Sequence, residues 1–340
     1  PSEVSELLDQ LAENKLNLGQ PQEAHDLHKE ARLLKSETDP NDIYLEARSL
    51  LRTGRLFEAR DLLDMASTPD PQDTLKRPQR FHREMSLLQA LIHLMLGNTE
   101  KGEYYSRQGI QIGQQLDSPF VEAVGWMRLG HAFQLHPHLP WRMDRLDQAK
   151  TFYERSIELV KPFNVMRVQV EPLWGLCRYF GYQNQLEEAR RLADQAIEIS
   201  TTAGDNWFVA LLNTTLGTSY LLGGSANLAQ SHLQEAITGF EQVGDFFGEI
   251  TASLHTVLNH WLYDSKQLAI QQISEVLPRL NQAGLSFLLT RPSHLGLQNP
   301  LLLWPILLEA HKQGLEHDWL PSFLKEKGLE GTNFHPGYGL

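Results

Sequence analysis

The sequence is poor in cysteine, because Cys177 is the only one among its 340 residues. A lone cysteine excludes an intrachain disulfide, and together with the lack of a signal-peptide pattern in residues 1–19 it favours a reducing, cytoplasmic location. Cys177 stands where a repeated helix requires a small side chain. We therefore expect a buried packing thiol and not a reactive one.

Long apolar runs and an excess of positive charge are also absent. The longest apolar run, residues 301–308, contains Pro305 and is much shorter than the roughly 18 residues of a membrane span. The net charge of -12 opposes attraction to nucleic acid and to anionic lipid. We expect no membrane contact and no direct nucleic-acid contact. One basic cluster is interpreted as a solvated loop between repeats and not as a phosphate site: Lys76, Arg77, Arg80 and Arg83.

Catalytic motifs are missing as well. The sequence contains no G-x-S-x-G motif, no H-E-x-x-H motif and no G-x-x-x-x-G-K-[ST] phosphate-binding loop. Cys177 has no identifiable histidine and acid partners. Charged neighbours such as Glu187, Glu188, Arg190 and Arg191 are interpreted as a solvated helix face. The sequence therefore predicts a protein without enzymatic activity and without a cofactor.

What the sequence does contain is an internal repeat. Ala189, Ala229 and Ala269 follow one another at intervals of 40 residues, and three glycines keep the same interval: Gly204, Gly244 and Gly284. A fixed period of this length is typical of solenoid proteins, in which each unit contacts only its neighbours.

The chemistry of one unit indicates a pair of helices. Leu216, Gly217 and Tyr220 lie about one turn apart on a first helix, Gly224 permits a turn, and three residues line the facing side of a second helix: Ala229, Leu233 and Ala236. This pattern resembles the tetratricopeptide repeat, with helices longer than in the usual unit of about 34 residues.

The same pattern extends towards the N-terminus. The positions equivalent to Ala229 are residues 24, 59, 102, 149, 189, 229 and 269. We therefore expect an all-α fold, a tetratricopeptide-like right-handed superhelix (α-solenoid) of about seven helix-turn-helix repeats with a C-terminal helical cap. Prolines predict loops at residues 68–78 and 135–145, and a polar residue followed by proline predicts helix starts at Pro40 and Pro119.

The period fails after Gly284, so we divide the chain into a repeat array, residues 1–284, and C-terminal capping helices with a linker, residues 285–340. An apolar helix is expected around residues 299–311 and a shorter one around residues 318–327. A final helix pair of this kind would cover the exposed apolar face of the last repeat.

The C-terminal part carries a more specific resemblance. Its segments FLLTRPSHLGLQNPLLLWPILLEA and NFHPGYGL, with the match running from Phe287 to Tyr338, are similar to the end of the repeat region in large bacterial transcriptional activators. These are multidomain signalling ATPases, maltose-regulator-like, that carry a bacterial transcriptional activator domain. The resemblance implies an ATPase module before the repeats and a winged-helix DNA-binding module after them. Both would lie outside this chain, which is then expected to be the sensor or relay part.

The inner face of such a superhelix is expected to be a binding groove lined by the first helix of each repeat. Eight side chains are candidates for contact with a ligand: Trp126, His131, Trp174, Arg178, Tyr182, Asn213, Thr218 and Asn259. In this mixture Arg178 would clamp a carboxylate and Asn213 would bridge backbone amides. The alternative is that many of the eight are ordinary packing residues, Trp126 and Trp174 above all.

A histidine cluster offers a weaker alternative. His131, His136 and His138 are spaced as in some metal sites, but the only nearby oxygen ligand is Asp144 and no cysteine is near. We interpret the stretch as a surface loop and predict no metal.

Together these observations favour a non-enzymatic sensor or scaffold of a bacterial transcriptional regulator. It would bind a peptide, a protein or a small inducer in the groove and relay binding to ATPase and DNA-binding modules outside the chain. The alternative is a stand-alone tetratricopeptide adaptor for protein assembly. An open reading frame that continues into a winged helix distinguishes the first hypothesis from the second.

Overall fold

The computed structural model describes residues 2–35, 40–65, 80–135, 143–163, 165–315 and 319–328. Throughout these ranges the regular structure is helical, without a β-strand, so the predicted all-α fold is confirmed. No helix within the described ranges is both long enough and apolar enough to cross a membrane.

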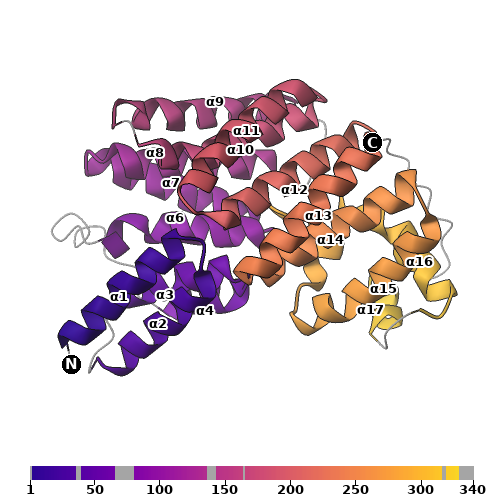
Figure 1. The fold of residues 1–340 in the computed structure, drawn as a ribbon, viewed down its shortest axis with the longest axis horizontal. Coiled ribbons are helices and arrows are strands. Elements are labelled where there is room, and N and C mark those ends of the chain that lie inside the picture. Colours follow the sequence, from indigo (N-terminus) through magenta and orange to yellow (C-terminus); the bar gives the residue numbers. More distant parts are fainter. Residues whose placement is uncertain are drawn as a thin grey trace.

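Helix pairs follow one another along the chain, as the repeat predicts (Figure 1). The first helices of the seven pairs are α1 (Ser2–Asn17), α3 (Pro40–Arg52), α6 (Arg80–Met95), α8 (Pro119–Gln134), α10 (Val170–Tyr182), α12 (Asn206–Leu222) and α14 (Phe246–Tyr263). The second helices are α2 (Pro21–Leu33), α4 (Leu56–Met65), α7 (Thr99–Gln115), α9 (Met143–Val160), α11 (Leu186–Thr202), α13 (Ala226–Val243) and α15 (Lys266–Gln282). Short 3₁₀ turns, η1 (Lys161–Phe163) and η2 (Met166–Gln169), connect α9 to α10.

In five of the pairs the internal turn has a left-handed residue two positions before the second helix. Gly224 has φ +76° and precedes α13 in this way, and Asn184, with φ +57°, has the same place before α11. The N–H groups of Gly224 and Ser225 donate to the last carbonyls of α12, at 3.1 and 2.8 Å. Glycine adopts this conformation without a steric penalty, which explains why the turn recurs with glycine.

The small residue that follows each turn lets the two helices approach. Ala229 is fully buried, and a Cβ added to Gly217 on the partner helix would lie 2.6 Å from Cγ of Leu233. The small residue is the fourth of the second helix in six pairs and the seventh of α9 in the remaining one: Ala24, Ala59, Gly102, Ala149, Ala189, Ala229 and Ala269. The predicted register of the array is therefore confirmed.

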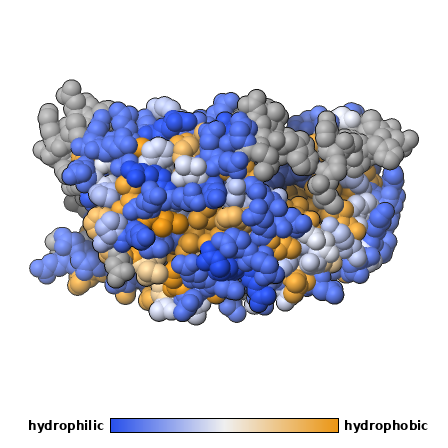
Figure 2. Space-filling model, turned by 90° about the horizontal axis from the view of Figure 1, so that it is seen from above, coloured by the Kyte–Doolittle hydropathy of each residue, from blue (hydrophilic) through white to orange (hydrophobic). Residues whose placement is uncertain are grey.

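The superhelix closes on itself, because the first two pairs touch the starts of α12 and α14. Nη1 of Arg52 lies 3.0 Å from Oδ1 of Asp205, and its guanidinium lies 4.1 Å from the ring centroid of Trp207. A Cβ added to Gly54 would lie 2.4 Å from the backbone nitrogen of Phe247. The array is thus a short, closed turn with an interior. On the face shown in Figure 2, hydrophobic surface lies mainly in recesses between hydrophilic ridges.

The C-terminal part contains two 3₁₀ turns and two α-helices: η3 (Ser286–Leu289), η4 (Pro300–Leu303), α16 (Trp304–Lys312) and α17 (Leu320–Glu326). The two predicted helices are therefore present, and α16 packs on α15 as a cap. The segment between η3 and η4 differs from the expectation. Residues 291–298 do not cover the end of the array but enter its interior. The division of the chain at residue 284 stays a prediction.

The basic cluster is only partly a loop. Arg80 and Arg83 lie in α6, so the expectation of a loop is wrong for these two residues. Lys76 and Arg77, like the whole predicted loop at residues 68–78, lie outside the described residues. Of the other predicted loop, residues 135–145, residues 136–142 lie outside the described residues, and the expectation of a loop is wrong for residues 143–145, because α9 begins at Met143.

Candidate functional site

The interior of the superhelix holds an extended segment of the same chain, residues 291–298, which we call the inner strap. The backbone N–H of His294 donates to the carbonyl of Leu94 at 3.1 Å, and Oγ of Ser293 donates to the carbonyl of Met95 at 2.8 Å. Both carbonyls lie at the end of α6, where the last carbonyls lack helical N–H partners, although that of Leu94 also accepts from the N–H of Gly97 at 3.2 Å. The strap therefore satisfies backbone groups of a distant helix.

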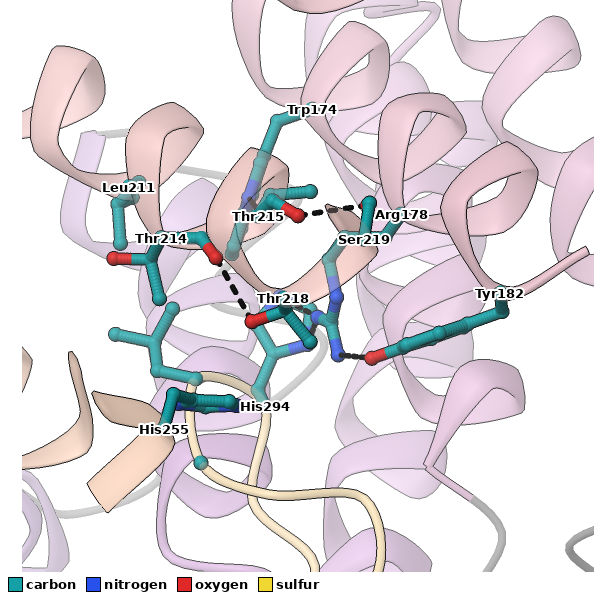
Figure 3. Close-up of a pocket in the computed structure, with 12 residues that line it drawn as sticks. Trp174, Arg178, Tyr182, Leu211, Thr214, Thr215, Thr218, Ser219, His255 and His294 are labelled. Atoms are coloured by element: carbon teal, nitrogen blue, oxygen red, sulfur yellow. Dashed lines mark hydrogen bonds between the residues drawn. The ribbon is translucent and has the colours of Figure 1, made fainter. Parts of the chain in front are cut away.

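His294 is the largest buried polar side chain of the strap and is only 1% exposed. Its ring centroid lies 3.9 Å from that of His131 on α8 and 4.7 Å from that of Trp174 on α10. Nη1 of Arg178 donates to its Nδ1 at 2.7 Å. Figure 3 shows Arg178 between the loop that carries His294 and the hydroxyl of Tyr182, which accepts from Nη2 at 3.0 Å.

Gln298, at the other end of the strap, binds to the same two helices, α8 and α10. In the amide orientation that satisfies both of its polar atoms, its oxygen accepts from Nη2 of Arg178 at 2.9 Å and its nitrogen donates to the carbonyl of Gln134 at 3.0 Å. Arg178 therefore holds the strap at two points.

Burial keeps the two facing histidines neutral. It is the largest cause that holds the pKa values of His131 and His294 well below the usual range, and the nearby charge of Arg178 acts in the same direction on both. A neutral His294 can accept the hydrogen bond from Arg178 at Nδ1. A second proton on either ring would place an imidazolium beside the guanidinium of Arg178 in a buried site.

The far wall of this site is a row of hydroxyl groups on α12. Thr214 and Thr218 each donate to a helix carbonyl four residues back, at 3.0 and 2.8 Å, as Ser219 does at 2.8 Å. The space left among these groups and the strap is about 20 Å³. The strap therefore nearly fills the part of the interior between α10, α12 and α14.

Five of the eight predicted groove residues meet around the strap. His131, Trp174, Arg178 and Tyr182 have the contacts given above, and Thr218 lines the remaining space together with His255. The structure brings them together as the helix-pair register predicts.

The other three candidates face second helices. The indole of Trp126 packs 5.4 Å from the ring centroid of Phe152 on α9, and Asn213 is 2.9 Å from Nδ1 of His232 on α13. Asn259 donates to the carbonyl of Ala226 at 3.2 Å. The expectation that all eight line one surface is corrected for these three, because helix packing determines their direction.

Sequence reasoning missed the strap itself and His255. The only local signal was the failure of helical periodicity after Gly284, with Pro292 and Gly296 in a stretch between apolar blocks. That signal indicates a non-helical segment but not the surface to which it binds.

Of the three histidines in the predicted cluster, the structure describes only His131. His131 is fully buried, with Nδ1 2.8 Å from the hydroxyl of Tyr153 and Nε2 3.2 Å from Glu171. His136 and His138 lie outside the described residues. Within the described ranges, no three histidine, cysteine or acidic residues are grouped as metal ligands.

Cys177 is buried in the helix pair, as predicted. Burial raises the pKa of its thiol, so the reactive thiolate is disfavoured at neutral pH.

Comparison with known proteins places the fold in the class of tetratricopeptide-like superhelices. The chain matches no family model and no curated protein. It is similar to the crystal structure of a Rap protein complexed with competence and sporulation factor, with 11% identity and a TM-score of 0.59, covering 96% of this chain and 91% of that one. NprR in complex with its cognate peptide NprX gives 14% identity and a TM-score of 0.55, covering 97% and 90%.

A third similar structure is a signal transduction ATPase with a tetratricopeptide repeat sensor from Pyrococcus horikoshii. Its identity is 14% and its TM-score is 0.47, covering 96% of this chain and 50% of that one.

Proposed function

We propose that this chain is a non-enzymatic regulatory scaffold that binds an extended peptide in its interior. The observation that carries the proposal is the inner strap, because it is itself an extended polypeptide held there by backbone and side-chain hydrogen bonds. A surface that holds one such segment has the groups needed to hold another.

The comparisons support this proposal at the level of fold. One similar structure is complexed with competence and sporulation factor, and another with the cognate peptide NprX. Peptide binding by this chain is an inference from that likeness together with the chemistry of its own interior.

The groups around the strap define what a ligand would meet. Arg178 offers a planar fork of N–H donors to a carboxylate or a carbonyl, and Trp174 offers a flat aromatic face. The hydroxyl oxygens of Thr214 and Thr218 retain lone pairs that can accept from backbone N–H groups. An extended peptide with a free carboxylate or polar side chains suits this surface.

A ligand at this site must displace the strap. Its apparent affinity is then lowered by the fraction of molecules in which the strap is docked, and binding shifts the population towards the released state. Because the strap is joined directly to η4 and α16, its release would be transmitted to the C-terminal helices. This gives the scaffold two states that a regulatory partner can distinguish.

We further propose that the chain is the sensor of a bacterial transcriptional regulator and relays binding to ATPase and DNA-binding modules outside it. The resemblance of residues 287–338 to the repeat end of such activators supports it. A reading frame that continues beyond Leu340 into a winged helix is the direct test of this proposal.

Selection from a phage-displayed library of random octapeptides tests the peptide proposal. We expect wild-type protein to enrich related sequences whose binding is lost in Arg178→Ala and weakened in Thr218→Val. The matched control is Arg190→Ala, because Arg190 is exposed on α11 and 62% of its side-chain surface is accessible. Failure to enrich any sequence, or equal binding to folded Arg178→Ala protein, would overturn the proposal.

A further inference from the structure

The interior contains a second and larger space, lined in part by α8. This cavity of about 280 Å³ lies between α3, α6, α8 and the start of α12. Its volume is close to the lower end of the range for small-molecule sites, about 300–1,000 Å³. No residue that lines it also lines the space beside the strap, so the two are separate sites. We call it the arginine cavity after three of its lining residues: Arg48, Arg52 and Arg128.

Three arginines and two glutamates line the cavity. Of the glutamates, Glu84 accepts from the hydroxyl of Tyr44 and Glu171 lies beside Arg128. Two carboxylates outside the lining hold arginines in position, since Asp205 lies 3.0 Å from Arg52 and Glu13 lies 3.4 Å from Arg48. Each guanidinium has five N–H donors, so these contacts leave donors directed elsewhere.

Arg128 is the buried cation of the cavity. It is only 9% exposed and forms an ion pair with Glu171, which also accepts from Nε2 of His131. Nε of Arg128 makes no hydrogen bond to any described part of the chain. A buried cation with an unsatisfied donor is unfavourable, and hydrogen bonds from its remaining N–H groups to an anion would offset part of that cost.

The neighbouring charges also favour an anion beside Arg128. Burial, followed by the positive charge of Arg52, lowers the pKa of Arg128. A negative group between the two guanidinium groups would reduce their repulsion.

The rest of the lining is apolar. Leu91, Met127 and Trp207 are among the buried residues of the wall, at 7%, 3% and 4% exposure. Phe120 lies at an exposed edge, 36% accessible, where its ring centroid is 4.7 Å from that of Phe163. A molecule that fills this space would therefore bury an apolar body while its charged end faces Arg128.

We propose that the arginine cavity binds a small organic monoanion, a carboxylate joined to an apolar body, with its carboxylate on Arg128. Asp205 and Glu13 already pair with Arg52 and Arg48, and Glu171 is shared between Arg128 and His131, so Arg128 is the lining cation with donors left for a ligand. Two kinds of molecule carry a carboxylate on an apolar body: a free aliphatic acid, and a short apolar peptide with a free C-terminal carboxylate. The site does not require that the strap be released, so it is independent of the peptide proposal.

Calorimetric titration of the full chain with octanoate tests the free-acid source, and N-acetyl-leucyl-leucine tests the peptide-terminus source. Octan-1-ol and the C-terminal amide of the same dipeptide are the uncharged controls. We expect at least one of the two acids to bind at least about tenfold more tightly than its uncharged control, because a charge-assisted hydrogen bond is lost with the carboxylate.

Two variants locate the site. Arg128→Met removes the guanidinium, and Val124→Phe fills the cavity while the arginines remain; both should weaken acid binding by about tenfold or more. Arg190→Ala on α11 is the exposed control and should bind as wild type does. Val124→Phe keeps the test decisive if Arg128→Met fails to fold.

The outcomes separate this inference from the proposed function. Acid binding that both variants weaken supports the cavity site, whether or not octapeptides bind elsewhere. Equal binding of each acid and its uncharged control, no binding of either acid, or unchanged binding in Val124→Phe would overturn it, even if peptide selection succeeds.

Discussion

Nη1 of Arg178 donates to Nδ1 of His294 at 2.7 Å, although 116 residues separate the two side chains in sequence. This bond joins the middle of the repeat array to the segment that follows its last repeat. The side chain expected to clamp a ligand is thus engaged by the chain itself. The predictions therefore concern the docking of the strap and its displacement by a peptide.

His294→Ala should release the strap. The substitution removes the bond to Arg178 and the ring contacts with His131 and Trp174, so we expect the free energy of unfolding to fall by about 2–3 kcal/mol. Hydrogen exchange at residues 293–297 should quicken in parallel. Arg291→Ala is the control within the same segment, because Arg291 is exposed, and it should change stability by less than about 0.5 kcal/mol. Equal exchange rates in the two variants would contradict a strap held by His294.

Gly97→Ala should disturb the strap from the opposite side. A Cβ at Gly97 would lie 2.7 Å from the carbonyl oxygen of Pro292. Gly224 provides the matched control, because it has nearly the same left-handed backbone, φ +76° against +73°, with nothing within 4 Å of an added Cβ. Both alanine variants carry left-handed strain of about 1–2 kcal/mol, but only Gly97→Ala should also raise hydrogen exchange in the strap. The same exchange profile in both would show that the contact with Pro292 is unimportant.

Gly54→Ala should open the closed superhelix. An added Cβ would lie 2.4 Å from the backbone nitrogen of Phe247 and 2.7 Å from Oδ1 of Asp245, so the second pair must move away from α14. We expect small-angle scattering to give a larger radius of gyration for Gly54→Ala than for wild type. Gly224→Ala, with a similar φ and no such neighbour, should keep the wild-type value. An unchanged radius in Gly54→Ala would mean that this contact does not hold the ring closed.

Acid should release the strap. The docked state lowers the pKa of His294 and of His131 below the value they regain in the released state. Docking is therefore fully stable above the ordinary histidine pKa of about 6.5 and weakens as the pH falls below it. Hydrogen exchange of the strap, corrected for its intrinsic pH dependence, should be faster at about pH 5 than at about pH 7.5.

The pH effect must be measured at the strap and not from global stability. Asp245 is buried at the start of α14, and burial raises its pKa to about 6. Its contribution has the opposite sign, because stability from a raised carboxyl pKa is lost as the pH rises through that value. His294→Gln should reduce the acid response at the strap. An equal response in wild type and His294→Gln would exclude His294 as its source.

The repeat could be predicted because its physical cause is local. A second helix packs closely on a first one only where a small residue stands, so Ala189, Ala229 and Ala269 recur at the period of the unit. The left-handed turn before five of the second helices requires glycine or a residue that tolerates the same backbone, as Gly224 and Asn184 show. These requirements act within a few dozen residues and remain visible in the sequence.

The direction of single side chains was less predictable. Asn213 stands four residues before Gly217, and the face that they share packs on α13, where an added Cβ at Gly217 would meet Leu233. The neighbouring position Thr214 faces the interior instead, together with Thr218. One residue along a helix changes direction by about 100°, so an error of one position moves a candidate out of the groove.

The strap could not be predicted from local pattern. Pro292 and Gly296 indicate that residues 291–298 are not helical, but the partners of His294 and Ser293 include carbonyls of Leu94 and Met95 about 200 residues earlier. No periodicity links segments so far apart. Only the three-dimensional closure of the array brings them together.

The most direct test of peptide binding in the interior supplies the strap as a separate molecule. A fluorescent octapeptide with the sequence of residues 291–298 is titrated against wild-type protein and against Ser293→Ala/His294→Ala, and its anisotropy is followed. We predict binding to the double variant, at least about tenfold weaker binding to wild type because its own strap competes, and loss of binding when Arg178→Ala is added. No binding to the folded double variant, or equal binding of a scrambled octapeptide, would contradict a peptide-binding interior.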